Sequence, residues 1–268
     1  MIDLKNDIII VRGAGDLATG TIIYFKRAGF RVIALETATP TTIRRTVALS
    51  DCVYDGKTTV EGISGIRVDT VDEALKFSSE KSIVPVLVDE SGVSIKQVKP
   101  KVVVDAIIAK RNCGTKITDA PLVVALGPGF TAGVDCTAVI ETARGHYLAR
   151  VITEKGKGAI PNTGIPGIIA GVGKERVIHS PSSGKFRGVK NIGDSVKQGE
   201  TIAYVDDTPV LASISGTLRG LLHSGLTVKE HFKIADIDPR DCKEYIHFVS
   251  DKARSIAGGV LLAIMMLS

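Results

Sequence analysis

The chain contains no tryptophan, few other aromatic residues and only four cysteines. Aromatic residues make up 4% of the 268 residues, and no basic stripe runs along the sequence. Because nucleic-acid grooves usually combine a basic stripe with aromatic stacking platforms, this composition argues against a nucleic-acid partner. The formal net charge of +5 is mild, and part of it is compatible with a small anionic ligand.

The cysteines indicate no metal centre. Cys52, Cys113, Cys136 and Cys242 lie far apart, without a CxxC pair or a Cys/His cluster of zinc spacing. We therefore expect no metal site and reduced, mostly buried thiols. Cys113 alone stands in a polar segment, residues 110–115, but a nucleophilic thiol needs a base partner and the sequence shows none.

Long hydrophobic runs are also missing. The first apolar run, Ile8–Val11, is too short for a signal peptide and follows charged residues. The apolar tail Ala253–Leu267 is about 15 residues long and contains Arg254, whereas a spanning helix needs about 20 apolar residues. We therefore expect residues 241–268 to form a C-terminal helix that packs back onto a soluble, cytoplasmic protein without membrane contact.

The N-terminal half alternates short β-branched runs with helical segments, which is typical of parallel βαβ units. The predicted strands are residues 8–11, 31–35, 84–88, 102–108 and 122–126, and the predicted helices are residues 16–28, 41–49 and 134–144. This order predicts a Rossmann-like α/β domain, a doubly wound parallel sheet of nucleotide-binding type, over residues 1–155.

Glycine and proline are dense between residues 156 and 174, which predicts a linker. Two interpretations stay open. The segment is a flexible joint, or its residues 162–167 (Asn-Thr-Gly-Ile-Pro-Gly) fold over the site of the first domain.

Residues 175–240 contain an internal repeat in which equivalent residues stand 32 positions apart. Matching pairs include Ser183 and Ser215, Gly184 and Gly216, Arg187 and Arg219, Val196 and Val228, and Ile202 and Ile234. The repeat predicts two related β motifs, and its spacing resembles the all-β barrel-sandwich hybrid of biotinyl and lipoyl domains. Those domains carry a modified lysine on the hairpin between the halves. The matching hairpin, residues 205–209, has no lysine, so we expect no covalent biotin or lipoate.

The sharpest local motif is the turn after the first predicted strand. Gly13, Gly15 and Asp16 stand in a G-x-G-x-x-[GA] pattern that opens a helix, where glycines let the backbone approach a pyrophosphate. Glu36 ends the next predicted strand, as a ribose-binding carboxylate does. Asp16 does not fit a pyrophosphate-binding turn, because its negative charge repels a phosphate. A tight turn without a ligand is the alternative.

Two further segments should reach the same edge of the sheet. Gly127 and Gly129 follow one predicted strand, and Lys110, Arg111 and Asn112 follow another. Ligands of open α/β sheets bind outside the carboxyl ends of the strands, so the three loops predict one shared site.

Three residues are candidates for acid or base chemistry, namely Asp105, Glu141 and His146. Asp105 interrupts an apolar run, where a buried charge is costly unless it is paired. Glu141 and Arg144 stand three apart on a predicted helix, close enough to pair. A structural ion pair is favoured over catalysis for each.

Several strings, taken in order, resemble one family over the whole chain. They are residues 12–20, 105–112, 126–130, 141–146, 162–167, 236–240 and 250–261. They resemble the YqeB-type family, known as selenium-dependent molybdenum hydroxylase system proteins, and the N-terminal domain is similar to the Rossmann part of XdhC-type maturation factors. The resemblance implies a role in maturing or supplying a molybdenum hydroxylase, with that enzyme or its other maturation factors as partners. It carries no reaction onto named residues, so whether the chain is an enzyme stays open.

Three hypotheses follow. The chain is an accessory factor that binds a nucleotide or a molybdopterin nucleotide and passes it on. Alternatively, it is an NAD(P)-dependent oxidoreductase, for which His146 and Lys110 are poor proton donors. The third hypothesis is a non-enzymic scaffold without ligand affinity.

Overall fold

The computed structural model describes residues 3, 6–164 and 167–268, which divide into two compact units. Unit 1 comprises Met1–Pro40, Ala48–Asn162 and Val249–Ser268, and unit 2 comprises Thr41–Val47 and Thr163–Phe248. Ile165 and Pro166, which belong to the segment expected to fold over the site, lie outside the described residues.

One mixed β-sheet forms the centre of unit 1, with nine strands in its described part. In spatial order these are β3 (Lys57–Val60), β4 (Ile63–Val68), β5 (Ile83–Val88), β2 (Arg31–Glu36), β1 (Ile8–Arg12), β6 (Val102–Asp105), β7 (Leu122–Leu126), β8 (Ala138–Ile140) and β9 (Val151–Ile152). In this spatial order, all strands from β4 through β8, including β1 and β2, run parallel to one another. The two edge strands, β3 and β9, are antiparallel to their neighbours. The central strands are fully buried and β-branched, as expected for a sheet covered on both faces.

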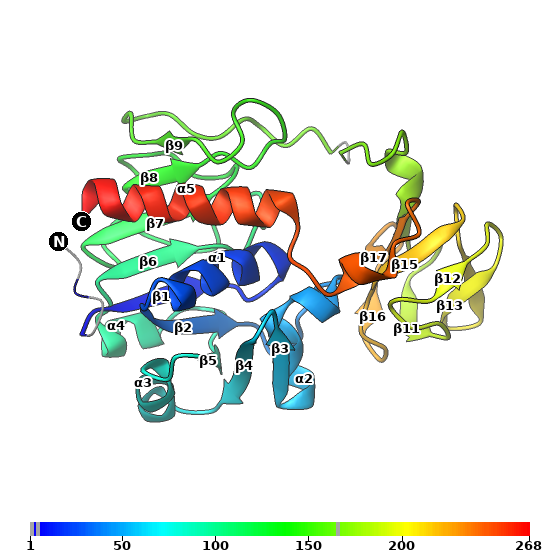
Figure 1. The fold of residues 1–268 in the computed structure, drawn as a ribbon, viewed down its shortest axis with the longest axis horizontal. Helices are drawn as coiled ribbons and strands as arrows, with labels where there is room; N and C mark the ends of the chain where they lie inside the picture. Colours follow the sequence, from blue (N-terminus) through cyan, green and yellow to red (C-terminus); the bar gives the residue numbers. More distant parts are fainter. Residues whose placement is uncertain (1–2, 4–5, 165–166) are drawn as a thin grey trace. The chain divides into compact units, whose positions relative to one another are not determined.

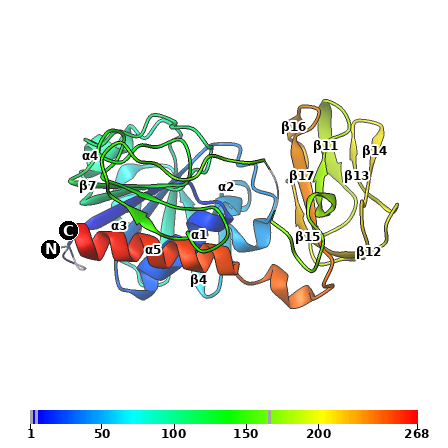
Figure 2. The ribbon, with the colours of Figure 1, turned by 90° about the horizontal axis from the view of Figure 1, so that it is seen from above.

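Helices cover the two faces of this sheet. They are α1 (Asp16–Arg27), α2 (Cys52–Asp55), α3 (Val71–Ser78), α4 (Ser94–Val98) and α5 (Asp251–Leu267). Helices α1 and α5 lie side by side on one face (Figures 1 and 2). On the other face, Ala74 of α3 and Ile95 of α4 share a core with Ile8 and Ile10 of β1. No helix in the described ranges is both long enough and apolar enough to cross a membrane.

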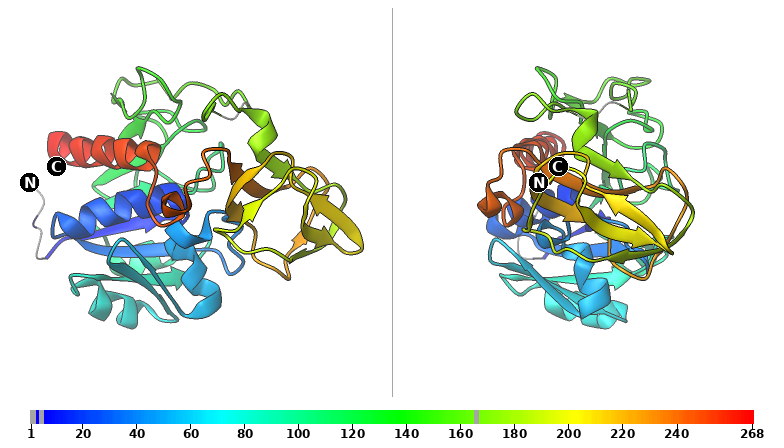
Figure 3. Two further views of the ribbon diagram at one scale, coloured as in Figure 1. Left: turned by 45° about the vertical axis from the view of Figure 1, so that its right-hand side comes forward. Right: turned by 90° about the vertical axis from the view of Figure 1, so that its right-hand side faces the viewer.

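Unit 2 contains two antiparallel sheets, each with four strands among the described residues (Figure 3). One has the order β10 (Val177–His179), β17 (Lys233–Asp238), β15 (Gly216–Leu221) and β12 (Ser195–Val196), and the other has the order β14 (Thr208–Leu211), β13 (Thr201–Val205), β11 (Gly184–Gly188) and β16 (Thr227–Val228). Strands β11, β12 and β13 begin 32 residues before β15, β16 and β17.

The two repeats of unit 2 are interleaved. Strand β12 of the first copy pairs with β15 of the second, and β16 of the second copy pairs with β11 of the first. Both copies bury the same positions in one core, since Phe186 and Ile202 correspond to Leu218 and Ile234 and all four are fully buried. Each copy therefore completes its sheets and buries its core only together with the other copy.

The prediction of a doubly wound, Rossmann-like parallel sheet with a biotinyl/lipoyl-like domain was wrong. The large sheet is mixed, and unit 2 is a pair of antiparallel sheets. At one edge, Glu61 and Gly62 adopt φ angles of 48° and 84°, which reverse the chain between β3 and β4 in a two-residue hairpin. At the other edge, β8 lies within the predicted helix 134–144, because the β-branched residues there fit a strand.

The predicted helix 41–49 was also wrong. Only 3₁₀ turns form there, at Arg45–Val47 and Leu49–Asp51. The carbonyl of Ile43 accepts a hydrogen bond from Leu221 N, and Arg45 Nε donates to Leu221 O. This segment therefore joins β15 of unit 2, and those long-range contacts outweigh its local helical pattern.

Candidate functional site

The candidate residues of unit 1 gather at the carboxyl ends of five neighbouring strands. Glu36 ends β2, Gly13 follows β1, Ala106 follows β6, Gly127 follows β7 and Glu141 follows β8. In sheets with parallel strands this edge is where ligands bind. The structure therefore places the predicted loops along one edge of the sheet.

Two glycines let the loops touch. A Cβ on Gly13, whose φ is +96°, would lie 2.9 Å from the carbonyl oxygen of Ala106. A Cβ on Gly129, whose φ is +106°, would lie 2.5 Å from the Cα of Arg111. The loop after β6 is thus in contact with both glycine-rich loops, and neither contact tolerates a side chain.

Glu36 binds the glycine-rich turn itself. Its Oε2 accepts a hydrogen bond from Ala14 N at 2.8 Å, and its Oε1 accepts one from Thr37 N at 2.8 Å. Burial raises the pKa of this carboxyl, and the two backbone N–H groups oppose the shift. Glu36 therefore anchors the turn. A ribose hydroxyl would have to donate to a Glu36 oxygen that already accepts a hydrogen bond from a backbone N–H group.

The rest of the turn is anchored as well. Gly13 N donates to Leu35 O at 2.7 Å, and Ala14 O accepts from Ser50 N at 2.8 Å and from Thr19 Oγ1 at 3.1 Å. Helix α1 begins after Gly15, which has no side chain to cap the first turn. The N-terminus of α1 is consequently held in place without a side-chain cap.

Asp105 belongs to a buried polar network. Thr115 Oγ1 donates to Asp105 Oδ2 at 2.5 Å and accepts a hydrogen bond from Arg12 Nη1. Arg12 Nη1 lies 3.8 Å from Asp105 Oδ2, and both side chains are almost fully buried. Burial raises the pKa of Asp105, opposed by hydrogen bonds from Thr115 and Ile107 and by the Arg12 charge. The sequence interpretation missed Arg12 and Thr115, and the arrangement is that of a structural ion pair.

Glu141 is held by backbone groups. Its Oε1 accepts hydrogen bonds from Thr142 N and Ala143 N, both at 2.7 Å, and its Oε2 accepts one from Ile160 N at 2.7 Å. The predicted pair with Arg144 was wrong, because these residues leave a strand rather than share a helix. Arg144 instead forms a bidentate pair with Asp251 at 2.8 and 3.1 Å.

The remaining predicted residues divide into two kinds. Asn112 shapes its own loop, since its Oδ1 accepts from Gly114 N and its Nδ2 donates to Thr115 O. Lys110, Arg111 and His146 are exposed. The first two lie on the loop that contacts Gly129 and are the ones available to a ligand at this edge.

Lys252 is a site residue that the sequence interpretation missed. It lies in the first turn of α5, where burial lowers its pKa; the charges of Arg144 and Lys110 lower it further, and those of Asp16 and Glu141 raise it. These four charged residues belong to three segments of unit 1, namely the start of α1, the loop after β6 and the loop after β8. Within the part of the chain that the structure describes, no direct hydrogen bond or ion pair engages that group. Its only sequence signal is the Ser-Asp-Lys-Ala string at the start of the C-terminal helix.

No family model matches the chain. Over 262 residues the chain is 48% identical to the "Uncharacterized protein YqeB" of Escherichia coli (strain K12), a stretch that covers 98% of this chain and 48% of that protein. This match supports the YqeB-type family. The chain spans about half the length of this curated relative.

Solved structures give only a faint likeness. An aspartoacylase family protein from Mesorhizobium loti is 11% identical, with 86% of this chain and 84% of that chain covered and a TM-score of 0.25. A succinylglutamate desuccinylase/aspartoacylase from Rhodobacter sphaeroides is 14% identical, with 86% and 85% covered and a TM-score of 0.25. Scores this low carry no argument about fold or activity.

In the described residues, no group of three or more His, Cys, Asp or Glu side chains is arranged to hold a metal ion. The groups suited to a ligand are the uncapped N-terminus of α1 and the cations of Lys110, Arg111 and Lys252. This combination suits an anionic ligand.

Proposed function

We propose that the carboxyl edge of unit 1 binds a phosphate-bearing, nucleotide-type ligand. The observation that carries this proposal is the half-buried Lys252, which has no direct hydrogen bond or ion pair among the described residues and lies near enough to Asp16, at the start of α1, to feel its charge. The carboxylates of Asp16 and Glu141 offset part of the positive charge here, but Arg144 and Lys110 add to it, so an anionic ligand would balance the remainder. Lys110 and Arg111, exposed on the neighbouring loop, would add charge-assisted hydrogen bonds.

The geometry favours a ligand that combines phosphate with a ribose. The uncapped first turn of α1 suits a phosphate group. The carboxylate of Glu36 lies next to the turn, where one of its oxygens can accept from a ribose hydroxyl while it holds Ala14 N. NAD(P) and a molybdopterin nucleotide both carry a pyrophosphate and a ribose, so both are candidate cofactors.

The chain's role would be that of an accessory factor that matures or supplies a selenium-dependent molybdenum hydroxylase. This part of the proposal rests on the resemblance to the YqeB-type family and not on the geometry. The hydroxylase or its other maturation factors would then be the partners, and the carboxyl edge would hold the cofactor before its transfer.

Calorimetry with NAD(P)(H), ATP, CTP and the nucleotide form of the molybdenum cofactor tests the proposal. We expect micromolar or tighter binding of at least one of these ligands. Binding of none of them would remove the nucleotide site and leave the scaffold hypothesis. Turnover of small substrates with NAD(P) would instead support the oxidoreductase.

A further inference from the structure

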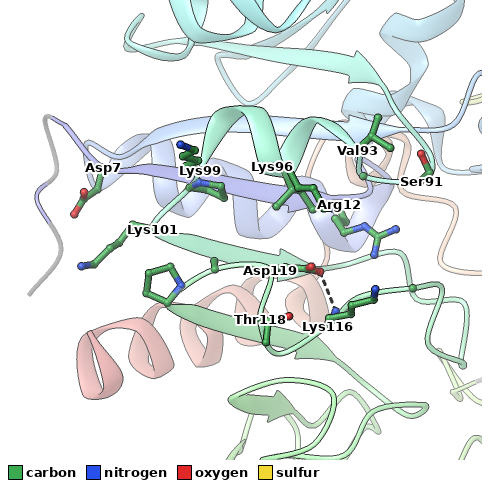
Figure 4. A pocket seen from close by; sticks show the side chains of 16 residues that line it. Asp7, Arg12, Ser91, Val93, Lys96, Lys99, Lys101, Lys116, Thr118 and Asp119 are labelled. Atoms are coloured by element: carbon green, nitrogen blue, oxygen red, sulfur yellow. Dashed lines mark hydrogen bonds between the residues drawn. The ribbon is translucent and has the colours of Figure 1, made fainter.

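A basic groove lies on the opposite face of the sheet from α1 and α5. It has a volume of about 1070 Å³ and lies between α4 and the loop that joins β6 to β7 (Figure 4). In the described part of that loop, residues 106–121, no helix forms. The groove is therefore bordered by the short α4 on one side and by this loop on the other.

Cations dominate the lining. Lys96, Lys99, Lys101 and Lys116 line the groove, against the two carboxylates of Asp7 and Asp119. Among the described residues, none of the four lysines has an ion-pair partner. The Asp119 carboxylate accepts a hydrogen bond from Lys116 N at 2.9 Å, so part of its capacity to accept hydrogen bonds is already used. The groove consequently presents an excess of uncompensated positive charge.

The charges are spread along the groove and do not meet at one point. Lys101 and Asp7 lie at the amino ends of β6 and β1, whereas Lys116 lies beyond the carboxyl end of β6 (Figure 4). A strand the length of β1 spans about 17 Å, at about 3.3 Å per residue. A single phosphate cannot reach lysines at both ends. An extended chain with several carboxylates can.

The lining also excludes base stacking and offers apolar contact. The lining residues that the structure describes include no aromatic side chain, so single-stranded nucleic acid would find no stacking platform on them. Val93, which is 66% exposed, and Pro121 give apolar surface between the lysines. From these features we propose that the groove binds an extended, acidic polypeptide segment of a partner protein. This proposal does not depend on the ligand site at the carboxyl edge.

Fluorescence anisotropy on the full chain tests the groove. The probe is a short labelled peptide that alternates glutamate and valine, compared with its glutamine counterpart and with oligothymidine of similar length. We expect the glutamate peptide to bind, with an affinity that falls as salt rises, and the other two probes to bind more weakly.

A matched pair of variants separates the groove from overall charge. Lys96→Glu/Lys116→Glu reverses two exposed groove lysines, and Lys57→Glu/Lys81→Glu reverses two exposed lysines elsewhere in unit 1. The first should weaken binding by roughly tenfold or more and the second by less than about twofold. Should the charge reversal disturb folding, Lys96→Gln/Lys116→Gln gives the same comparison with a smaller loss. Equal losses in both pairs, no binding at low salt, or tighter binding of oligothymidine would each overturn the proposal.

Discussion

The carboxylate of Glu36 accepts a hydrogen bond from Ala14 N at 2.8 Å, so the end of β2 holds the glycine-rich turn that follows β1. Burial raises the pKa of Glu36 above its ordinary value of 4.5. A carboxyl whose pKa is raised by folding holds its proton more tightly in the folded state. Its contribution to the free energy of unfolding is therefore complete below pH 4.5 and declines as pH rises through the raised pKa.

The variant Glu36→Gln tests this relationship. Glutamine resembles the protonated carboxyl, which also has one good acceptor oxygen, so the two proteins should have similar stability below about pH 4.5. Because the variant does not titrate, the free energy of unfolding of wild type should fall below that of the variant as pH rises through the raised pKa. Urea unfolding of both proteins at a series of pH values measures this difference. A wild type that becomes more stable than the variant as pH rises would show that hydrogen bonding to the charged carboxylate outweighs burial.

Gly13→Ala tests the contact between the first two loops. The residue has a φ of +96°, and a Cβ there would lie 2.9 Å from Ala106 O, a backbone atom that cannot rotate away. Strain and overlap together should lower the free energy of unfolding by at least about 1–3 kcal/mol. Gly258→Ala is the control, because a Cβ on that helical glycine meets nothing within 4 Å. Chemical denaturation of both variants gives the comparison.

The elements that the sequence predicts well are those with local causes. The run Ile8–Val11, the glycine turn and the helix after it follow from β-branched residues, glycine and helical spacing, and all three form. The hairpin of β3 and β4 depends on a Glu-Gly turn that lacks the usual Asn-Gly or Asp-Gly signal, so it was missed. Residues 41–47 contact β15, far along the chain, and a local pattern does not reveal such a partner.

The candidate site likewise combines features that follow from local sequence with contacts between residues far apart in the chain. That the glycine turn opens α1 is a local property, as is the position of Glu36 at the end of β2. The hydrogen bond from Ala14 to Glu36 and the pairing of Arg12 with Asp105 are contacts between neighbouring strands. Lys252 reaches the edge only because α5 returns to unit 1 beside α1, more than two hundred residues later in the chain.

Arg12→Met tests whether Asp105 is structural. Removing the guanidinium leaves a buried carboxylate without its cation, which should cost about 3–5 kcal/mol of unfolding free energy. The double variant Arg12→Met/Asp105→Asn removes both charges and should recover part of the loss. Denaturant melts of wild type, Arg12→Met, Asp105→Asn and the double variant measure the coupling. A double variant that is as unstable as the sum of the two single changes would contradict a direct pair.

Gly15→Val separates ligand binding from stability. The residue has a φ of −65° and a ψ of −177°, which a side chain tolerates, so folding should survive. The isopropyl group would stand where a phosphate must approach the N-terminus of α1, and binding in the ligand panel should be lost. Thermal unfolding serves as the control for the calorimetry. Unchanged affinity in a folded variant would place the ligand elsewhere.

Lys252→Gln tests the cation at the centre of the proposed site. The ammonium group has no direct partner among the described residues, so its removal should leave stability nearly unchanged but weaken ligand binding by about 1.5–3 kcal/mol. Arg111→Ala should weaken binding by a similar amount if its contact is charge-assisted. Lys57→Gln, an exposed lysine on β3, is the control and should bind as wild type does.

The pH profile of binding distinguishes Lys252 from the exposed cations. Burial lowers its pKa below the ordinary value of 10.5, so Lys252 loses its charge before an exposed lysine does as pH rises. Wild-type affinity for an anionic ligand should therefore decline on the alkaline side at a lower pH than it does in Lys252→Gln, which lacks this ammonium group. Calorimetry of the best ligand across this range measures both curves. Identical profiles, together with a full loss in Arg111→Ala, would assign the anion contact to the loop after β6 and remove Lys252 from the site.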